Sequence, residues 1–349
     1  TCDVIYIPEY NLLKVNGHTD IKAFDEIFSL YKKSSSKFSV ERKFGGVVSS
    51  HGRPYHFHYN VGLAARTLYN EGLLSLIENF YHIEGSDFEY IAESYALDES
   101  NDIVVSAKEM EDLSLQGNEF FIKLGMYFTS PKHDFLARQY DTKLMSFSIH
   151  NNKRLKPEVE MLSQCYPVVW LGVTMQKRSW VEQIDGYSLV IKKLYEIYPD
   201  LGVVFDGWTS PLTPGAIDEV ETKNDQKIVS KIISNISSNI KTLSIVGQPT
   251  RTKLNVASIV DFAITNQMTG GMHIARMAQK KVITHINQEA FATTFKQHIM
   301  PNAIHFPIKD VHDIPDPKMK RFDFTSYSIS PESMSDFVLK NLPNLLNAN

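Results

Sequence analysis

The stretch Asp261–Thr284, DFAITNQMTGGMHIARMAQKKVIT, decides how we interpret the fold. Its apolar run Phe262–Ile264 is typical of a buried strand, and the turn residues Thr269–Gly271 let the backbone bend tightly. Helical spacing of apolar residues follows over Met272–Ala278, and Val282–Ile283 begins a second buried strand. The stretch therefore predicts a strand, a glycine-rich turn, a helix and another strand.

The glycine-rich turn predicts an anion site. When such a turn follows a parallel strand, the first N–H groups of the next helix lack helical partners, and the helix dipole adds positive potential there. We expect Thr269, Gly270 and Gly271 to hold a phosphate in this way, with His273 facing the phosphate or a ribose. An alternative stays open, in which this is an ordinary Gly-Gly turn of an α/β protein and His273 only caps the helix.

The second half of the chain alternates strands with helices. Strand-like runs occur at Val168–Val173, Leu201–Phe205, Leu243–Val246, Phe262–Thr265, Val282–His285 and Ala303–Phe306. This rhythm predicts a doubly wound parallel sheet, whose ligands bind outside the carboxyl ends of the strands. The polar residues expected at those ends are Lys177, Arg178, Asp206, Gly247 and Thr250, together with the glycine-rich turn.

The first half shows a less regular pattern. Strands are predicted at Gly45–Ser50, Phe88–Glu93, Ile103–Ser106, Phe120–Leu124 and Leu144–Ile149, and helices at Ile21–Tyr31 and Val61–Asn79. A loop rich in histidine and tyrosine, His51–Asn60, follows the first of these strands.

Three interpretations of this loop stay open. His56 and His58 alternate and could share a metal, but no carboxylate or cysteine lies near in sequence, so we expect no metal site. The loop could simply be packed aromatic structure. In the functional interpretation it faces a cleft, where Arg53 binds an anion and a histidine near neutral pKa acts as general base.

Composition limits the class of protein. The 349 residues are enough for two domains, and a net charge of −4 argues against binding driven by nucleic-acid phosphates. Two distant cysteines, Cys2 and Cys165, fit a reducing compartment. Since no apolar run is long enough to span a bilayer and no secretory signal is visible, we expect a cytoplasmic protein. We predict domains at residues 1–152 and 158–330, joined by a polar linker, and a C-terminal helix over 331–349 that returns to the first domain.

The glycine-rich motif resembles a known signature. Thr269–Ala275, TGGMHIA, followed by Lys280–Ile283, KKVI, is similar to the nucleotide-sugar motif of the ADP-heptose transferase family, D-S-G-P-M-H-x-A with G-K-P-V-V downstream. Lys177–Trp180 is similar to the K-R-W segment of that family, and the resemblance covers about residues 165–290. Met268 stands where the family has its aspartate. Arg53–His56 also resembles a segment of bacterial capsule and O-antigen transferases, including those that use CMP-sugars.

The resemblance implies the GT-B architecture, in which two Rossmann-like domains face a cleft. It implies a glycosyltransferase of polysaccharide biosynthesis that takes a nucleotide sugar as substrate, needs no cofactor, and transfers to a glycan, lipid-linked or protein hydroxyl, with association at the inner membrane face left open. Catalytic candidates are His51, His56 and Arg178. Donor candidates are Lys177, Arg178, Asp206, Gly247, Thr250, Thr269, Gly270, Gly271 and His273, and acceptor candidates are Arg53, Tyr55 and His58.

Two alternatives to a transferase remain. Because Met268 replaces the aspartate, the chain could be a non-catalytic module that binds nucleotide sugars or glycans. A nucleotide-sugar epimerase of the same shape is the other alternative, and it would act without any acceptor.

Overall fold

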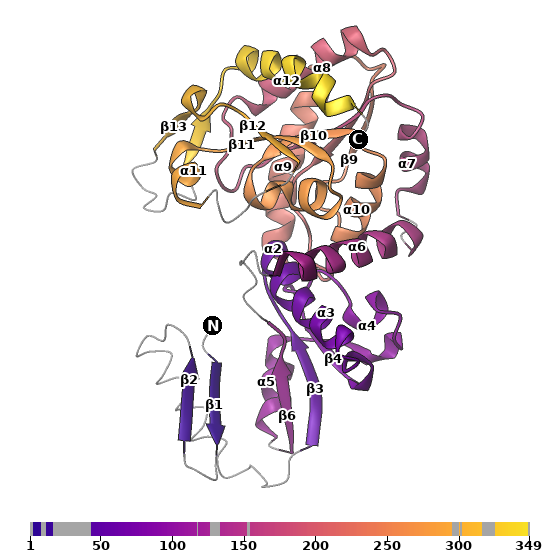
Figure 1. Ribbon diagram of the computed structural model, residues 1–349, viewed down its shortest axis with the longest axis vertical. Coiled ribbons are helices and arrows are strands. Elements are labelled where there is room, and N and C mark those ends of the chain that lie inside the picture. Colours follow the sequence, from indigo (N-terminus) through magenta and orange to yellow (C-terminus); the bar gives the residue numbers. More distant parts are fainter. Residues whose placement is uncertain are drawn as a thin grey trace.

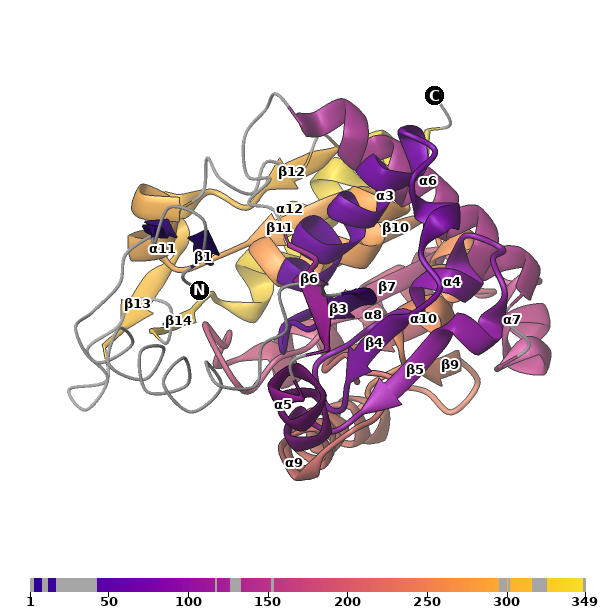
Figure 2. The same cartoon turned by 90° about the horizontal axis from the view of Figure 1, so that it is seen from below.

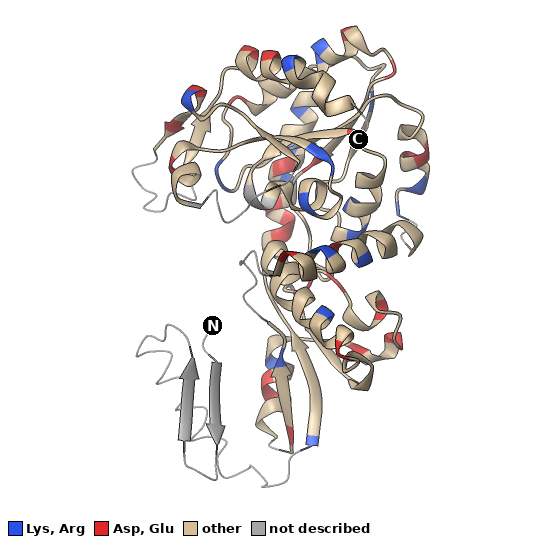
Figure 3. Cartoon of the chain, viewed as in Figure 1, with Lys and Arg blue, Asp and Glu red and all other residues tan. Residues whose placement is uncertain are grey.

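A computed structural model describes residues 3–7, 12–16, 43–116, 118–125, 133–151, 154–294, 300, 302–315 and 325–347. The described residues form two parallel sheets, which lie on opposite sides of helix α6 (Asp134–Asn151) (Figure 1). Charged residues of both signs are spread over the elements around both sheets (Figure 3). The fold is therefore α/β, as predicted.

The second half of the chain forms a six-stranded parallel sheet in the order β12-β11-β10-β7-β8-β9. Its strands are β7 (Val168–Gly172), β8 (Gly202–Asp206), β9 (Lys241–Ser244), β10 (Phe262–Asn266), β11 (Lys281–His285) and β12 (Ala303–His305). In chain order this is 6-5-4-1-2-3, the strand order of Rossmann sheets, and it reverses between β7 and β10. The predicted doubly wound sheet is confirmed, and such a reversal opens a crevice at the carboxyl ends of the strands.

Helices cover both faces of this sheet. They are α7 (Lys156–Leu162), α8 (Gln183–Ile197), α9 (Ala216–Ser234), α10 (Thr250–Ser258), α11 (Gln288–Thr294) and α12 (Pro331–Leu346), with a 3₁₀ turn η6 (Met268–Gly271) and a π-helical turn η7 (Met272–Met277). Buried strand residues alternate between two apolar clusters, so Val203 and Phe205 pack on one face and Val204 on the other. Burial on both faces explains why the strands read as continuous apolar runs.

Ser330 caps α12 as predicted, since its side chain accepts from the Ser333 N–H and Pro331 occupies the first helical position. The helix packs mainly on α8 and β11, within the C-terminal part, and lies far from the first sheet (Figure 1). A small antiparallel pair is formed by β13 (His312–Ile314) and β14 (Ser326–Ser328).

The first half forms a four-stranded parallel sheet in the order β5-β4-β3-β6 (Figure 2). Its strands are β3 (Lys43–Ser49), β4 (Phe80–Ile83), β5 (Asp102–Val105) and β6 (Glu119–Lys123). Its longer helices are α3 (Leu63–Asn70) and α5 (Ala107–Leu115), and the shorter ones are α2 (Pro54–His56), η2 (Phe57–Gly62), η3 (Leu74–Leu76), α4 (Ile91–Ser94) and η4 (Glu99–Asn101). A separate antiparallel pair is formed by β1 (Asp3–Ile7) and β2 (Leu12–Asn16).

Several predictions for the first half were wrong. The predicted strand Leu144–Ile149 lies inside α6, whose buried residues follow the helical pattern i, i+3, i+4, i+7 and i+11: Ala137, Tyr140, Asp141, Leu144 and Ser148. The predicted strand Phe88–Glu93 is a bend leading into α4, and β4 was missed. The loop predicted at His51–Asn60 becomes helical at Pro54, and the helix predicted to reach Asn79 ends at Asn70. The helix predicted at Ile21–Tyr31 lies outside the described residues.

Helix α6 packs on α10 and η7 and so joins the two sheets. The joint has its own apolar cluster, which includes Tyr55, Tyr59, Tyr140, Leu254 and Met272. It also contains an ion pair, in which the Arg251 guanidinium on α10 contacts Glu89 and, at 2.6 Å, Glu93 of the first half. Glu89 is only 3% exposed at its side chain, so its charge depends on this partner.

Arg251→Met tests whether this ion pair holds the domains together. Removing one partner of a buried pair costs about 3–5 kcal/mol because the other charge stays buried. With an unfolding entropy of about 2.1 cal/mol/K per residue, Tm should fall by about 4–7 °C. The matched control is Lys193→Met, which breaks an exposed pair with Asp336 and should change Tm by about 1 °C or less. Equal Tm losses in the two variants would contradict this role of Arg251.

Candidate functional site

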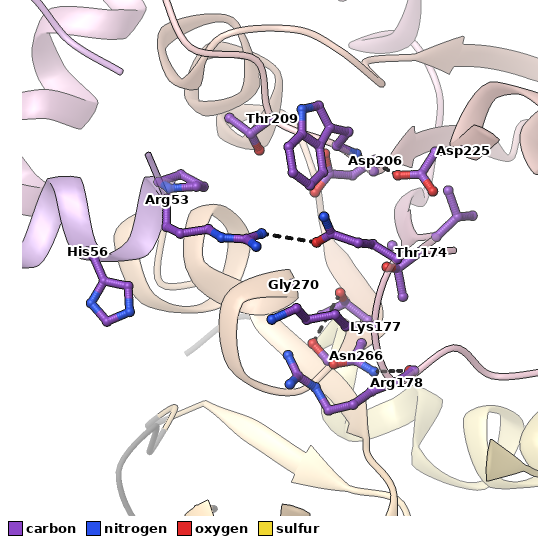
Figure 4. A pocket seen from close by; sticks show the side chains of 17 residues that line it. Arg53, His56, Thr174, Lys177, Arg178, Asp206, Thr209, Asp225, Asn266 and Gly270 are labelled. Atoms are coloured by element: carbon purple, nitrogen blue, oxygen red, sulfur yellow. Dashed lines mark hydrogen bonds between the residues drawn. The ribbon is translucent and has the colours of Figure 1, made fainter. Parts of the chain in front are cut away.

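A pocket of about 450 Å³ lies at the carboxyl ends of β7, β8 and β10, where the strand order reverses, and the start of α2 faces it from the first half (Figure 4). This size is within the range of ligand sites in proteins. The residues that line it are Arg53, Pro54, His56, Gly172, Val173, Thr174, Gln176, Lys177, Arg178, Asp206, Gly207, Trp208, Thr209, Asp225, Thr265, Asn266 and Gly270. Both halves of the chain therefore contribute to one pocket.

Three cationic side chains line this pocket: Arg53 on one side, and Lys177 and Arg178 on the other (Figure 4). Arg53 donates a 3.0 Å hydrogen bond across the pocket to the Gln176 side chain. Arg178 is 7% exposed and has a left-handed backbone, with φ of +49°. The arrangement favours a ligand with more than one negative charge.

Two histidines stand beside the cations. His56 lines the pocket, and the ring of His51 stacks on it with 4.8 Å between the centroids. Burial, reinforced by the neighbouring Arg53 charge, lowers the pKa of His56 below its usual 6.5. Burial and the His56 ring lower the pKa of His51 to about 4. Both rings are therefore neutral at pH 7, and His56 is placed to accept a proton from a ligand in the pocket.

The pocket's two carboxylates are held by the protein. Asp206 accepts a 2.5 Å hydrogen bond from the Nζ of Lys253, which is fully buried and also donates to Gly207 O, Trp208 O and Thr209 Oγ1 at 2.8–2.9 Å. This lysine fixes the loop after β8, so Asp206 shapes the wall of the pocket with its charge compensated. Asp225 accepts from the backbone N–H groups of Met175 and Trp208 at 3.0 and 2.8 Å, while burial raises its pKa to about 7.

The glycine-rich turn reaches the pocket through Gly270. A Cβ on Gly270 would lie 3.1 Å from Thr265 Oγ1, and one on Gly271 would lie 2.6 Å from the sulfur of Met300. The two glycines therefore allow close packing beside the pocket. The predicted turn Thr269–Gly271 lies in the 3₁₀ turn η6, and the helix predicted over Met272–Ala278 is the π-helical turn η7.

Four other predicted site residues lie in the joint between the halves, outside the pocket lining. His58 is fully buried, with its ring nitrogens 2.8 Å from Tyr140 Oη and 3.0 Å from Thr250 Oγ1. Thr250 Oγ1 lies 3.3 Å from His273 Nε2, which continues the chain of hydrogen bonds. Tyr55 accepts from the Arg276 guanidinium at 3.0 Å. Burial lowers the pKa of His58 to about 3, so its ring is neutral at pH 7.

Gly247, the remaining donor candidate, also lies outside the pocket lining. Its φ is +78°, which favours glycine, and its N–H donates to Trp208 O at 2.8 Å. The pocket residues that sequence reasoning missed include Asp225 and Asn266, and it also missed Lys253 beneath the pocket. Asn266 was visible as a polar residue at the end of a predicted strand, whereas Lys253 and Asp225 lie within helices and gave no signal.

Within the described part of the chain, no three His, Cys, Asp or Glu side chains converge closely enough to hold a metal ion. Nor does any described helix combine the length and apolar character needed to cross a bilayer.

No family model matches this chain, and no curated protein matches it. Solved structures are similar to it at low identity. One is assigned as a UDP-N-acetylglucosamine 2-epimerase from Listeria monocytogenes, with 9% identity, a TM-score of 0.48, and coverage of 85% of this chain and 87% of that one. A glycosyl transferase family 9 protein from Veillonella parvula has 11% identity, a TM-score of 0.46, and coverage of 88% and 99%. S. aureus MnaA bound to UDP has 10% identity, a TM-score of 0.40, and coverage of 95% and 74%.

The predicted α/β class with two parallel sheets is confirmed, and both halves of the chain contribute residues to one pocket, as the prediction of two domains around a cleft requires. Because these identities and TM-scores are so low, the activity has to be argued from the pocket itself.

Proposed function

We propose that the protein is a glycosyltransferase that moves a sugar from a nucleotide-sugar donor to an acceptor hydroxyl. The observation that supports this most is the convergence of Arg53, Lys177 and Arg178 with the neutral His56 in one pocket between the halves. Lys177 and Arg178 suit the phosphates of the donor, Arg53 suits an anionic group of the acceptor, and a neutral histidine suits proton removal from the acceptor hydroxyl.

In the proposed reaction the acceptor oxygen attacks the anomeric carbon of the donor sugar. The bond from that carbon to the phosphate oxygen breaks, and the nucleotide leaves with the electron pair. His56 takes the proton of the acceptor hydroxyl. Arg178 and Lys177 stabilise the charge on the departing phosphate, a role in which fixed cations contribute several kcal/mol in buried sites.

The two halves divide the substrates in this proposal. The loops after β7, β8 and β10 hold the donor, because ligands of such sheets lie at the carboxyl ends of the strands. Gly270 provides a wall without a side chain beside the phosphates. Arg53 and His56, from the first half, face the acceptor.

A thermal-shift screen against ADP-, UDP-, GDP-, TDP- and CMP-sugars tests donor binding. A ligand at one hundred times its Kd adds about 2.7 kcal/mol of stability, which should raise Tm by about 3–4 °C for a chain of this size. Arg178→Ala should remove the shift, whereas the control Lys193→Ala, which removes a cation far from the pocket, should keep it. No shift with any of the five classes would contradict the proposal.

Incubating the protein with the donor that binds separates the three activities. A transferase releases nucleotide faster when acceptor glycans are added. An epimerase changes the sugar of the free donor without releasing nucleotide, and a binding module leaves the donor intact. Either of the last two results would replace the proposed transferase.

The pH dependence of kcat/KM tests the general base. A base with a lowered pKa is active above that pKa and is lost as it becomes protonated, so kcat/KM should be level near pH 7 and fall toward acid. Since burial lowers the pKa of His56, the half-point should lie below pH 6.5. A half-point near 4 would indicate His51 instead. A profile that is still rising above pH 7 would contradict both assignments.

A further inference from the structure

The loop that carries Lys177 and Arg178 has an unusual backbone. Arg178 is in the left-handed region, with φ of +49°, which residues other than glycine adopt rarely. Such a conformation persists only where surrounding contacts determine it. The contacts that hold Arg178 therefore also decide where its guanidinium points.

Asn266, at the end of β10, holds this backbone directly. Its side-chain nitrogen donates to the Arg178 carbonyl oxygen at 2.9 Å and to Tyr327 Oη at 2.9 Å. The backbone of Tyr327 pairs with the same loop, since its N–H donates to Ser179 O at 3.0 Å and its carbonyl accepts from Val181 N–H at 2.9 Å. Two separate elements thus fix the loop from Arg178 to Val181.

The hydroxyl of Tyr327 connects the Asn266 side chain to His285, the last residue of β11. Because it accepts from Asn266, its own proton is free to go to His285 Nδ1, which lies 2.6 Å away. Burial lowers the pKa of His285 to about 3, so the ring is neutral, and its other nitrogen then carries the proton.

The chain of hydrogen bonds ends on the backbone of β7. His285 Nε2 lies 3.4 Å from Tyr187 Oη, and the Tyr187 hydroxyl donates to Gly172 O at 2.8 Å. Along this chain of hydrogen bonds each group therefore donates to the next, from Asn266 through Tyr327 and His285 to Tyr187. Tyr327, His285 and Tyr187 are each at most 3% exposed, so water does not replace these partners.

We propose that Tyr327 is a positioning residue for donor phosphates: through Asn266, its hydroxyl holds Arg178 in the left-handed conformation that presents the guanidinium to the pocket. This inference rests on the proposed function. Tyr327 does not itself line the pocket, whereas Asn266 and Arg178 do. Its effect on ligand binding must therefore pass through Asn266, and in this proposal Asn266 passes it on to the loop of Arg178.

Tyr327→Phe removes only the hydroxyl and keeps the ring. We expect its affinity for the best-binding nucleoside diphosphate, and for inorganic pyrophosphate as a probe without a base, to fall about tenfold, since a misplaced guanidinium loses much of a charged hydrogen bond. Tyr95→Phe is the matched control. It removes the hydroxyl of a buried tyrosine in the first half that does not line the pocket, and we expect less than a twofold change.

A double-mutant cycle separates positioning from general stability. If Tyr327 acts through Arg178, adding Tyr327→Phe to Arg178→Ala should change diphosphate affinity less than twofold, although each change alone weakens binding. Losses that multiply in the double variant, or unchanged affinity in Tyr327→Phe, would overturn the proposal. If the unmodified protein binds neither nucleoside diphosphate nor pyrophosphate, the proposed function fails first, and this inference fails with it.

Discussion

Replacing Arg178 with alanine should lower kcat/KM for the nucleotide-sugar donor about 100- to 1000-fold, the usual effect of removing one fixed charge-stabilising donor. Arg178 is almost fully buried at the pocket wall, where the low dielectric strengthens its attraction to phosphate. Steady-state kinetics with varied donor concentration measures the effect. Arg178→Lys should be intermediate, because lysine keeps the charge but not the paired N–H geometry.

Lys193→Ala is the control for charge alone, since Lys193 is a partly exposed residue of α8 that does not line the pocket. It should leave kcat/KM within about twofold, because salt screens the charge of a partly exposed side chain that does not contact the ligand. If Arg178→Ala and Lys193→Ala behave alike, Arg178 does not contact the donor.

His56→Gln should lower kcat about 10²- to 10⁴-fold, which is the range for loss of a general base. Glutamine keeps a polar side chain of similar size but cannot take the proton, so donor affinity should stay within about twofold. The acid limb of the pH profile should also disappear. Single-turnover kinetics at saturating donor is the suitable measurement, because it separates chemistry from nucleotide release.

His51→Gln is the matched control in the same stack. Its ring contacts His56 and does not line the pocket, so we expect a loss well below that of His56→Gln. A larger loss in His51→Gln would reverse the two roles. Normal kcat in both variants would place the base elsewhere in the pocket.

The C-terminal sheet could be predicted because the apolar runs and the turn residues that follow them indicate the same strands. Parallel strands buried on both faces, such as β8 and β10, give uninterrupted apolar runs, and turn residues end each of them. Their carboxyl ends must then converge, which is why Lys177, Arg178, Asp206 and Gly270 could be placed together.

The first half could be predicted less well because its patterns are ambiguous. The run at Leu144–Ile149 is apolar enough for a strand, and only its burial against α10 shows the helical period. The π-helical turn η2 carries His58 into the joint while His56 stays in the pocket, although only Phe57 stands between them. Alternating strand geometry would have placed both rings on one face.

Contacts between residues distant in sequence determine which of the predicted site residues line the pocket. His273 and Thr250 belong to plausible donor motifs, yet both are buried in the joint between α6 and α10. Lys253 is separated from Asp206 by 47 residues, and Tyr327 from Asn266 by 61. Such pairings depend on the packed fold, so residue spacing in one sequence carries no trace of them.

The central claim is that the phosphates of a nucleotide sugar lie between the two halves of the chain. A crystal structure of the protein with the nucleoside diphosphate that binds best tests it most directly. The account predicts phosphate oxygens within hydrogen-bonding distance of Arg178 and Lys177, beside Gly270, with His56 facing the open side of the terminal phosphate. A nucleotide bound elsewhere on the chain, or phosphates in this pocket that contact neither cation, would contradict it.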